Sequence, residues 1–217
     1  MLKIEPFSPF IYTGKYSDRI SPPYDVISGE YKKELLKKDR YNVVRVILPE
    51  SYDESRRELE RWKKNGIIKK IEEGFFYLEQ FFGGKVRRGI LASLRISKDI
   101  KKYIIPHEKT YKKFKEDRYR LFKRTEMNFS PVFLITRKEI DFENIKKEKL
   151  FSYKLKDHSG KIFGIFDTDE KNRLRNILSK RKYFIADGHH RFEVALRLFK
   201  EGFSERTFIY LASIKDI

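Results

Sequence analysis

Cysteine is absent from this sequence of 217 residues. The absence excludes disulfide bonds, thiolate catalysis and metal centres with cysteine ligands, so any metal would need His, Asp or Glu. Long apolar runs are also missing, and no window is apolar enough to cross a bilayer. The N-terminus lacks the basic, apolar and small-residue order of a secretory signal. We therefore expect a cytoplasmic protein.

Acidic residues are too few to balance the basic ones. Lys and Arg number 50 and Asp and Glu number 32, which gives a formal net charge of +18. Such a field attracts anions, including nucleic acids, nucleotides and phosphorylated metabolites. The alternative is a heat-adapted surface, because charged residues are abundant while Gln and Met are scarce. Heat adaptation explains the number of charges better than their imbalance.

Strand and helix patterns fill the chain, with no internal repeat. Prolines and glycines exclude a long helix in residues 1–30, and two β-prone runs around Gly83–Gly84 predict a hairpin over 75–96. Apolar runs and spacings predict strands at 41–50, 130–136, 162–167, 183–187 and 206–214, and helices at 51–66, in the second half of 107–124, at 170–181 and at 189–202. This mixture of hairpins and crossovers predicts an α+β fold with a mixed β-sheet and flanking helices.

The stretch YFIADGHHRFEVALRLFK (183–200) joins a predicted strand to a predicted helix. Apolar residues recur at i, i+3, i+4 and i+7, which fixes one buried helix face: Phe192, Ala195, Leu196 and Phe199. The helix must therefore begin near Gly188, with Asp187 as its N-cap. His189, His190 and Arg191 then occupy the first helical turn.

The chemistry of that first turn favours an anion. Backbone N–H groups are unpaired there, and the helix dipole adds partial positive charge. Gly188 would let a phosphate approach the backbone, Arg191 would supply a forked donor, and the imidazoles of His189 and His190 could donate as well. The alternatives are an ordinary cap with two surface histidines, or a metal site in which one histidine joins His107 and a carboxylate.

The stretch SPPYDVIS (21–28) places an acidic residue after two prolines. Pro22 and Pro23 hold the chain extended and so aim Tyr24 and Asp25 in a fixed direction. Asp25 could then hold Mg²⁺ or accept a proton from a substrate hydroxyl. The alternative is an ordinary turn in which Asp25 bonds to the backbone.

The stretch IPHEKTYKKFKEDR (105–118) supplies further candidates. Glu108 is a second candidate base, and Lys109 could neutralise phosphate oxygens. Basic residues between Lys109 and Arg124 are interleaved with aromatic ones, a mixture that would also suit RNA or single-stranded DNA. The alternative, which helical spacing favours, is a helix with an aromatic inner face and a solvated basic outer face.

Three blocks of the sequence carry a family resemblance. They are SPPYDVIS (21–28), PHEKTYKKFKEDRYRLF (106–122) with NFSPVFL (128–134), and ADGHHRFEVAL (186–196). In this order they resemble the domain of unknown function 1015 family, over most of the chain. Members of that family typically continue beyond this point, so we expect a short form lacking the C-terminal part. We expect a single α+β domain over 1–217, with a Pro-rich arm and the hairpin in 1–125.

The Asp-Gly-His-His-Arg turn also resembles the nucleotide-phosphate loop of the ParB and sulfiredoxin superfamily. This resemblance implies a ParB/sulfiredoxin-like part over 126–217, and it implicates Gly188, His189, His190 and Arg191 in phosphate binding. The superfamily includes a CTP-binding chromosome-partitioning protein, an ATP-dependent sulfinic acid reductase and archaeal kinases of free L-serine. The reductase needs a cysteine in the loop, so that activity is excluded here.

These observations predict a nucleotide-dependent phosphotransferase acting on a small hydroxyl metabolite, with free L-serine as the acceptor that the superfamily implies. ATP or ADP would place its phosphates on residues 187–191 and Lys109, with Mg²⁺ held by Asp187 or Asp25. Glu108 or Asp25 would take the proton of the attacking hydroxyl. The alternatives are a ParB-like nucleic-acid-binding module and a nucleotide sensor without turnover.

Overall fold

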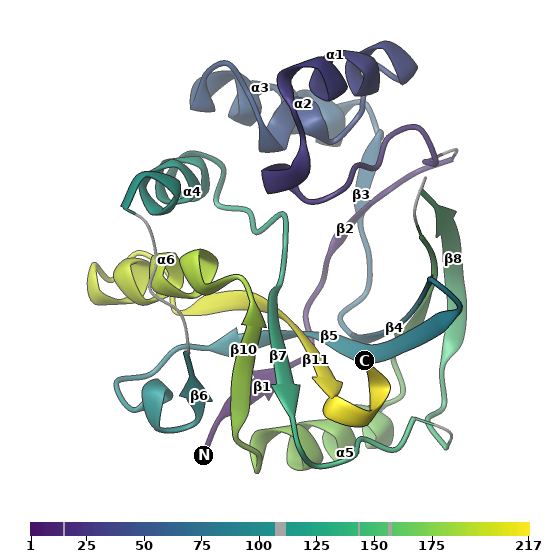
Figure 1. Cartoon of the computed structure of the whole chain (residues 1–217), viewed down its shortest axis with the longest axis vertical. Helices are drawn as coiled ribbons and strands as arrows, with labels where there is room; N and C mark the ends of the chain where they lie inside the picture. Colours follow the sequence, from purple (N-terminus) through teal and green to yellow (C-terminus); the bar gives the residue numbers. More distant parts are fainter. Residues whose placement is uncertain (15, 107–111, 143, 156–157) are drawn as a thin grey trace.

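The computed structural model describes the chain except for residues 15, 107–111, 143 and 156–157 (Figure 1). Its centre is a mixed β-sheet in the order β6-β10-β7-β11-β5-β4-β9-β8, with β1 paired to β5. The strands of this sheet are β1 (Lys3–Glu5), β4 (Phe75–Phe82), β5 (Lys85–Arg95), β6 (Ile104–Ile105), β7 (Val132–Thr136), β8 (Glu148–Lys154), β9 (Ser159–Ile165), β10 (Tyr183–Asp187) and β11 (Arg206–Ser213).

Helices flank this sheet, and a second small sheet stands apart from it (Figure 1). The helices are α1 (Gly29–Lys38), α2 (Val44–Ile47), α3 (Tyr52–Lys64), α4 (Lys112–Thr125), α5 (Thr168–Ser179) and α6 (His189–Lys200), with 3-10 turns η1 (Tyr24–Val26), η2 (Ile100–Lys102) and η3 (Ile214–Asp216). The second sheet pairs β2 (Phe10–Tyr12) with β3 (Ile68–Lys70). None of the described helices is long and apolar enough to span a membrane.

Strand pairing in the large sheet is of both kinds. β7 runs parallel to β11 and β6 runs parallel to β10, whereas the pairs β4–β5, β5–β11, β4–β9 and β8–β9 are antiparallel. The predicted mixed sheet with flanking helices is therefore confirmed. The sheet also joins strands from both sides of residue 125, since β11 pairs with β5 and with β7.

The predicted hairpin is the β4–β5 pair. Phe82 lies opposite Lys85, so the loop consists of two residues. Gly83 and Gly84 both have positive φ, 53° and 76°, as a type I′ turn requires. Glycine adopts these angles without a side-chain clash, and this turn matches the twist of the flanking strands.

One face of the large sheet carries the main core. Side chains of α5 and α6, including Leu174, Leu178, Phe192 and Ala195, pack there against sheet residues such as Ile90 and Leu134. The opposite face carries a smaller cluster around Leu78, Tyr210 and Ala212. Apolar residues of the predicted α6 stripe are thus in the core, as their spacing indicated.

Residues 10–70 form a lobe that projects from the large sheet (Figure 1). The lobe contains β2, β3 and α1–α3, and its own core is built around Trp62, which is 1% exposed, with Leu59, Val46, Ile47 and Ile68. The chain enters and leaves the lobe at one place, where Phe7 and Gly74 form a bridge. Helix α4 packs against both α3 and α6, and so joins the lobe to the rest of the chain.

The strand predicted at 41–50 is wrong. Residues 44–47 form the short helix α2, and the cause is the buried side chain of Asn42. Its carbonyl oxygen accepts from the Val44 N–H at 3.0 Å, and its amide donates to the carbonyls of Asp18 (2.7 Å) and Ile20 (3.2 Å). These tertiary hydrogen bonds start a helical turn where the β-branched residues alone favour a strand.

The predicted helices are confirmed within a few residues. Helix α3 begins after Ser51, whose hydroxyl accepts from the Glu54 N–H at 3.2 Å. Helix α5 begins after Asp167, whose carboxylate accepts from the N–H groups of Asp169 (3.0 Å) and Glu170 (3.1 Å). Both starts follow the ordinary preference for Ser and Asp at the N-cap.

Candidate functional site

The junction between β10 and α6 forms where the sequence predicts it, but its cap differs. The N-cap of α6 is Gly188, in a left-handed conformation with φ of +87°, and Asp187 is the last residue of β10. The expectation that Asp187 caps the helix is therefore wrong. Its carboxylate instead accepts a charge-assisted hydrogen bond from the Arg191 guanidinium.

Gly188 makes room for the Arg191 side chain. A Cβ atom at position 188 would lie 2.7 Å from Arg191 Nε and 2.9 Å from Nη2. The guanidinium therefore lies directly against the turn, and it donates to the Asp187 carboxylate. His189 is buried, at 5% exposure, whereas His190 is partly exposed. The two histidines thus occupy the predicted first turn but very different surroundings.

A small pocket opens where α4, α6 and the lobe meet. Its volume is about 50 Å³. Tyr24 of η1, Arg118 of α4 and Arg191 of α6 line it, together with Leu121, Phe122, Met127, Asn128, Phe129, Ser130 and Val194. The pocket therefore brings together segments that lie about 100 and 170 residues apart in the sequence.

Arg118 is held firmly in this pocket. Its side chain is only 10% exposed, and its guanidinium carbon lies 4.2 Å from the centre of the Tyr24 ring. Nη2 donates to the Ile47 carbonyl at 3.0 Å and Nε donates to Asp117 Oδ2 at 2.7 Å. Asp117 in turn accepts from the Tyr52 hydroxyl at 3.0 Å. Among the described residues, these contacts leave Nη1 of Arg118 without a partner.

Two guanidinium groups set the electrostatics of the pocket. Burial raises the pKa of the Tyr24 hydroxyl above its ordinary value, while the positive charges of Arg118 and Arg191 act in the opposite direction. Tyr24 is therefore close enough to both arginines to experience their fields. Tyr24 stays protonated and neutral at physiological pH, so the charges at the pocket are those of the two guanidinium groups and of their carboxylate partners, Asp117 and Asp187.

A non-glycine residue with positive φ directly precedes the segment that lines the pocket. Glu126 follows α4 with φ of 55°, the one such residue in the described part of the chain. Its N–H donates to the Phe122 carbonyl at 2.7 Å and closes the last turn of the helix. The chain then reverses and carries residues 127–130 along the pocket. Strain of this kind is concentrated at functional positions in proteins.

The predicted site residues do not all meet at this pocket. Arg191 lines it, whereas Gly188, His189 and His190 do not, and Asp25 is exposed on η1 beside Tyr24. His107, Glu108 and Lys109 lie outside the described residues. Within the described part of the chain, no group of three or more His, Asp or Glu side chains is placed where it could hold a metal ion.

Sequence reasoning missed the role of Arg118 and the residues around it. Arg118 pairs with Asp117, and its guanidinium also lines the pocket. Asn128 and Ser130 likewise line it. A signal was available, since Tyr24, Arg118, Asn128 and Arg191 all belong to the blocks that carry the family resemblance.

Comparison with known families agrees with those blocks. Residues 4–207 match the family described as "Protein of unknown function (DUF1015)". The chain belongs to this family. The match covers nearly the whole chain, and so it includes every segment of the pocket. No curated protein and no solved structure matches the chain significantly.

Proposed function

We propose that this member of the DUF1015 family is a nucleotide-dependent phosphotransferase acting on a small hydroxyl metabolite. The observation that carries the proposal is the convergence of Arg118 and Arg191 on one pocket, beside the neutral Tyr24 hydroxyl. Phosphoryl transfer requires positioning and charge neutralisation, and two fixed guanidinium groups supply both. The likeness of the β10–α6 turn to ParB and sulfiredoxin nucleotide loops supports the same assignment.

The size of the pocket suits a phosphoryl group. At about 50 Å³ it has room for roughly three or four water molecules, whereas a pocket for a whole drug-sized ligand has about 300 Å³ or more. In this proposal the terminal phosphate enters between Arg118 and Arg191, and the sugar and base remain outside the pocket. The Asn128 amide and the Ser130 hydroxyl are additional donors on its wall.

Asp187 has two roles in the proposal. Without ligand its carboxylate neutralises Arg191, in the place that a phosphate oxygen would take. It is 67% exposed, so it can turn away when a phosphate arrives. Mg²⁺ is commonly held by one or two carboxylates together with substrate phosphates, and Asp187 fits that pattern, with Asp25 as a second candidate. The ion would neutralise the charge on the nucleotide.

The base and the acceptor extend the proposal. Asp25, exposed beside the pocket residue Tyr24, or Glu108 would take the proton from the attacking hydroxyl. Free L-serine is the acceptor that the superfamily likeness favours. Nucleotide sensing without turnover would use the same pocket, so turnover distinguishes it from a kinase.

Nucleic-acid binding through α4 has less support. Four cations among the described side chains of this helix are engaged in ion pairs: Lys115 with Glu193 (2.6 Å), Arg120 with Glu116 (2.9 Å), Lys123 with Glu201 (3.3 Å) and Arg124 with Asp53. Three of these carboxylates belong to α6 or the segment just after it, or to α3, so the charges bind α4 to its neighbours. These four described cations therefore do not form a free basic face.

Calorimetry with ATP, ADP and Mg²⁺ tests the pocket. Replacing Arg191 with Ala removes a charge-assisted contact of about 1.5–3 kcal/mol, so nucleotide affinity should fall roughly 10- to 100-fold. Arg120→Ala is the matched control, because Arg120 is an exposed arginine of α4 that pairs within its own helix. Equal affinities for wild type and Arg191→Ala would contradict the proposal.

A second experiment tests turnover. Wild type should convert serine or another hydroxy amino acid to its phosphate ester in the presence of ATP or ADP and Mg²⁺. Asp25→Asn should lose the transfer while still binding nucleotide, if Asp25 is the base. Tight nucleotide binding with no acceptor phosphorylated would identify a sensor instead of a kinase.

A further inference from the structure

Contacts from the lobe fix the position of Arg118 in the pocket between α4, α6 and the lobe. Arg118 is on α4, but its Nη2 atom donates to the Ile47 carbonyl at 3.0 Å, and its guanidinium carbon lies 4.2 Å from the Tyr24 ring centre. Its partner Asp117 accepts from the Tyr52 hydroxyl at 3.0 Å. Among the described residues, each hydrogen bond or ring contact that Arg118 and Asp117 make outside α4 is therefore with the lobe.

The Ile47 carbonyl is available to Arg118 because α2 ends at this residue. Helix α2 has only four residues, Val44–Ile47, and the carbonyls at the end of a helix have no partner within it. The buried Asn42 side chain starts this short helix by accepting from the Val44 N–H. Asn42 thus indirectly supplies an acceptor for the Arg118 guanidinium.

Tyr52 acts on Arg118 through Asp117. Asp117 Oδ1 accepts from the Tyr52 hydroxyl, while Oδ2 accepts from Arg118 Nε at 2.7 Å and from its Nη2. The guanidinium is planar and rigid, so these bonds fix its orientation as well as its place. Tyr52 begins α3, and the next residue, Asp53, pairs with Arg124 about two helical turns further along α4. The start of α3 is therefore attached to α4 at two points.

We propose that Tyr52 is a positioning residue for phosphate binding, which acts by holding Asp117 and thereby the Arg118 guanidinium. This inference rests on the proposed function, because it concerns how the same pocket is assembled. Within the described part of the chain, Nε and Nη2 of Arg118 are occupied, so Nη1 is the donor left for a phosphate oxygen. Asp117 is 43% exposed, so without the Tyr52 hydroxyl it can turn toward solvent and take the guanidinium with it.

The same contacts couple phosphate binding to the lobe. If the docked lobe orients Arg118 for a phosphate, a bound phosphate must favour the docked lobe by the same free energy. The lobe has its own core around Trp62, separate from the core of the large sheet, so its docking on α4 can change without unfolding of either core. Bound nucleotide should therefore reduce the opening of the lobe.

Calorimetry with ATP and Mg²⁺ tests the positioning role. Tyr52→Phe removes one hydroxyl and no charge, and the ATP affinity should fall roughly two- to 30-fold. In an Arg118→Lys background, which keeps the charge but lacks the fork, Tyr52→Phe should cause no further loss. The matched control is Tyr119→Phe, which should keep wild-type affinity. Tyr119 is also bonded to a carboxylate, Glu201 Oε2 at 2.6 Å, but it does not line the pocket.

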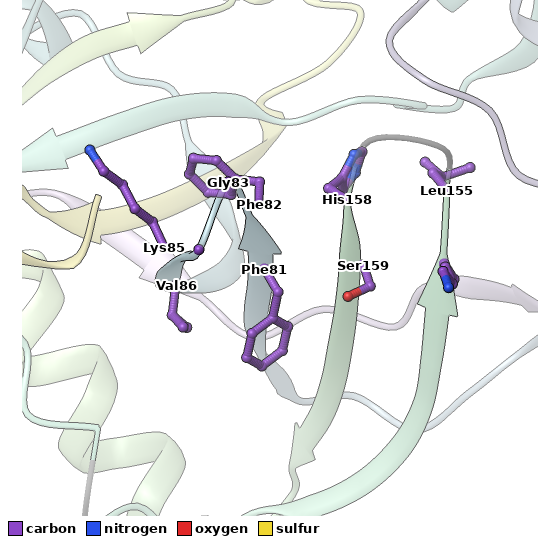
Figure 2. Close-up of a pocket in the computed structure, with 10 residues that line it drawn as sticks. Phe81, Phe82, Gly83, Lys85, Val86, Leu155, His158 and Ser159 are labelled. Carbon is purple, nitrogen blue, oxygen red and sulfur yellow. The ribbon is translucent and has the colours of Figure 1, made fainter.

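Hydrogen exchange tests the coupling to the lobe. With ATP at about 100 times its Kd, amides of α3 that exchange through opening of the lobe should exchange up to about 100-fold more slowly. The comparison region is the ends of the β4–β5 and β8–β9 hairpins, where a cavity of about 380 Å³ shares no lining residue with the pocket (Figure 2). The amides of Phe81 and Ser159 in this region should exchange at unchanged rates, since they open locally.

The outcomes separate this inference from the proposed function. Wild-type affinity in Tyr52→Phe, an equal loss in Tyr119→Phe, or an undiminished effect of Tyr52→Phe in the Arg118→Lys background would overturn the positioning role while nucleotide binding itself remained. No slowing of exchange in α3, or equal slowing at the hairpin ends, would contradict the coupling to the lobe. A wild-type protein that binds neither ATP nor ADP would refute the proposed function and this inference together. Circular dichroism confirms that each variant is folded.

Discussion

Replacing Gly188 with Ala separates the structural part of the α6 turn from its ligand-binding part. Alanine at φ of +87° is strained, at about 1–2 kcal/mol, which corresponds to a fall in Tm of roughly 2–8 °C for a chain of this length. The new Cβ would also lie 2.7 Å from Arg191 Nε, so the guanidinium must move. Because it is the end of a flexible side chain in a partly exposed ion pair, this movement adds at most about 1 kcal/mol.

The displacement of the Arg191 guanidinium should reduce nucleotide affinity far more than it reduces the stability of the fold. With Arg191 displaced, nucleotide affinity should fall roughly 10- to 100-fold, as in Arg191→Ala. Gly202→Ala is the control, since Gly202 follows the other end of α6 with φ of +68° and open space around its Cα. It should lose similar stability and no affinity. Urea unfolding and calorimetry measure the two effects.

Two results would refute this reasoning. One is a Gly188→Ala protein that binds ATP with wild-type affinity, because the turn would then not position Arg191 for the ligand. The other is a loss of stability several kcal/mol larger than in Gly202→Ala, because the Arg191 contact would then be structural. The double variant with Arg191→Ala should bind no more weakly than either single variant, as expected for residues that act as one unit.

Two further predictions concern the fold. Gly89→Ala should destabilise the sheet by about 3 kcal/mol or more in urea unfolding, because its Cβ would lie 2.4 Å from the Leu211 carbonyl oxygen, a backbone atom; Gly29→Ala, with nothing within 4 Å, should be neutral. Burial tends to raise the pKa of the Asp39 carboxyl, but hydrogen bonds from the Tyr41 N–H (2.6 Å) and Arg19 (3.0 Å) outweigh it and hold the pKa low. Asp39→Asn should therefore lose about 1–2 kcal/mol at pH 7, and this difference from wild type should vanish as the pH falls through the lowered pKa of the Asp39 carboxyl; a difference that persists below that pKa would contradict the assignment.

Local signals were sufficient for most of the fold. The two glycines at 83 and 84 predict the hairpin, and the apolar spacing after Gly188 predicts helix α6 with its buried face. They fail where a distant group decides the conformation. Residues 44–47 form a helical turn because the Asn42 amide bonds to carbonyls about 22–24 residues earlier. Asp187 leaves the N-cap because Arg191 offers it a charged partner.

The candidate site was only partly predictable for the same reason. Arg191 could be assigned from its place in a helical first turn, which is local information. Arg118 could not, because its position depends on the Ile47 carbonyl and the Tyr24 ring, both far away in the sequence. The functional alternatives for α4 could not be separated either, since the carboxylates that pair with its cations come from α3, from α6 and from the residue after α6.

The lobe is an insertion between β1 and β4, two strands that pair end to end with β5 in the large sheet. Strand β1 ends with Glu5 opposite Ser93, and β4 continues along the same strand with Phe76 opposite Leu91. One position, opposite Ala92, separates them. Joining Glu5 directly to Phe75 would fill that position and keep the inward alternation of Ile4 and Phe75, both fully buried. The pairing with β5 therefore keeps its register across an insertion of 69 residues. This insertion places Tyr24 in the pocket with Arg118 and Arg191.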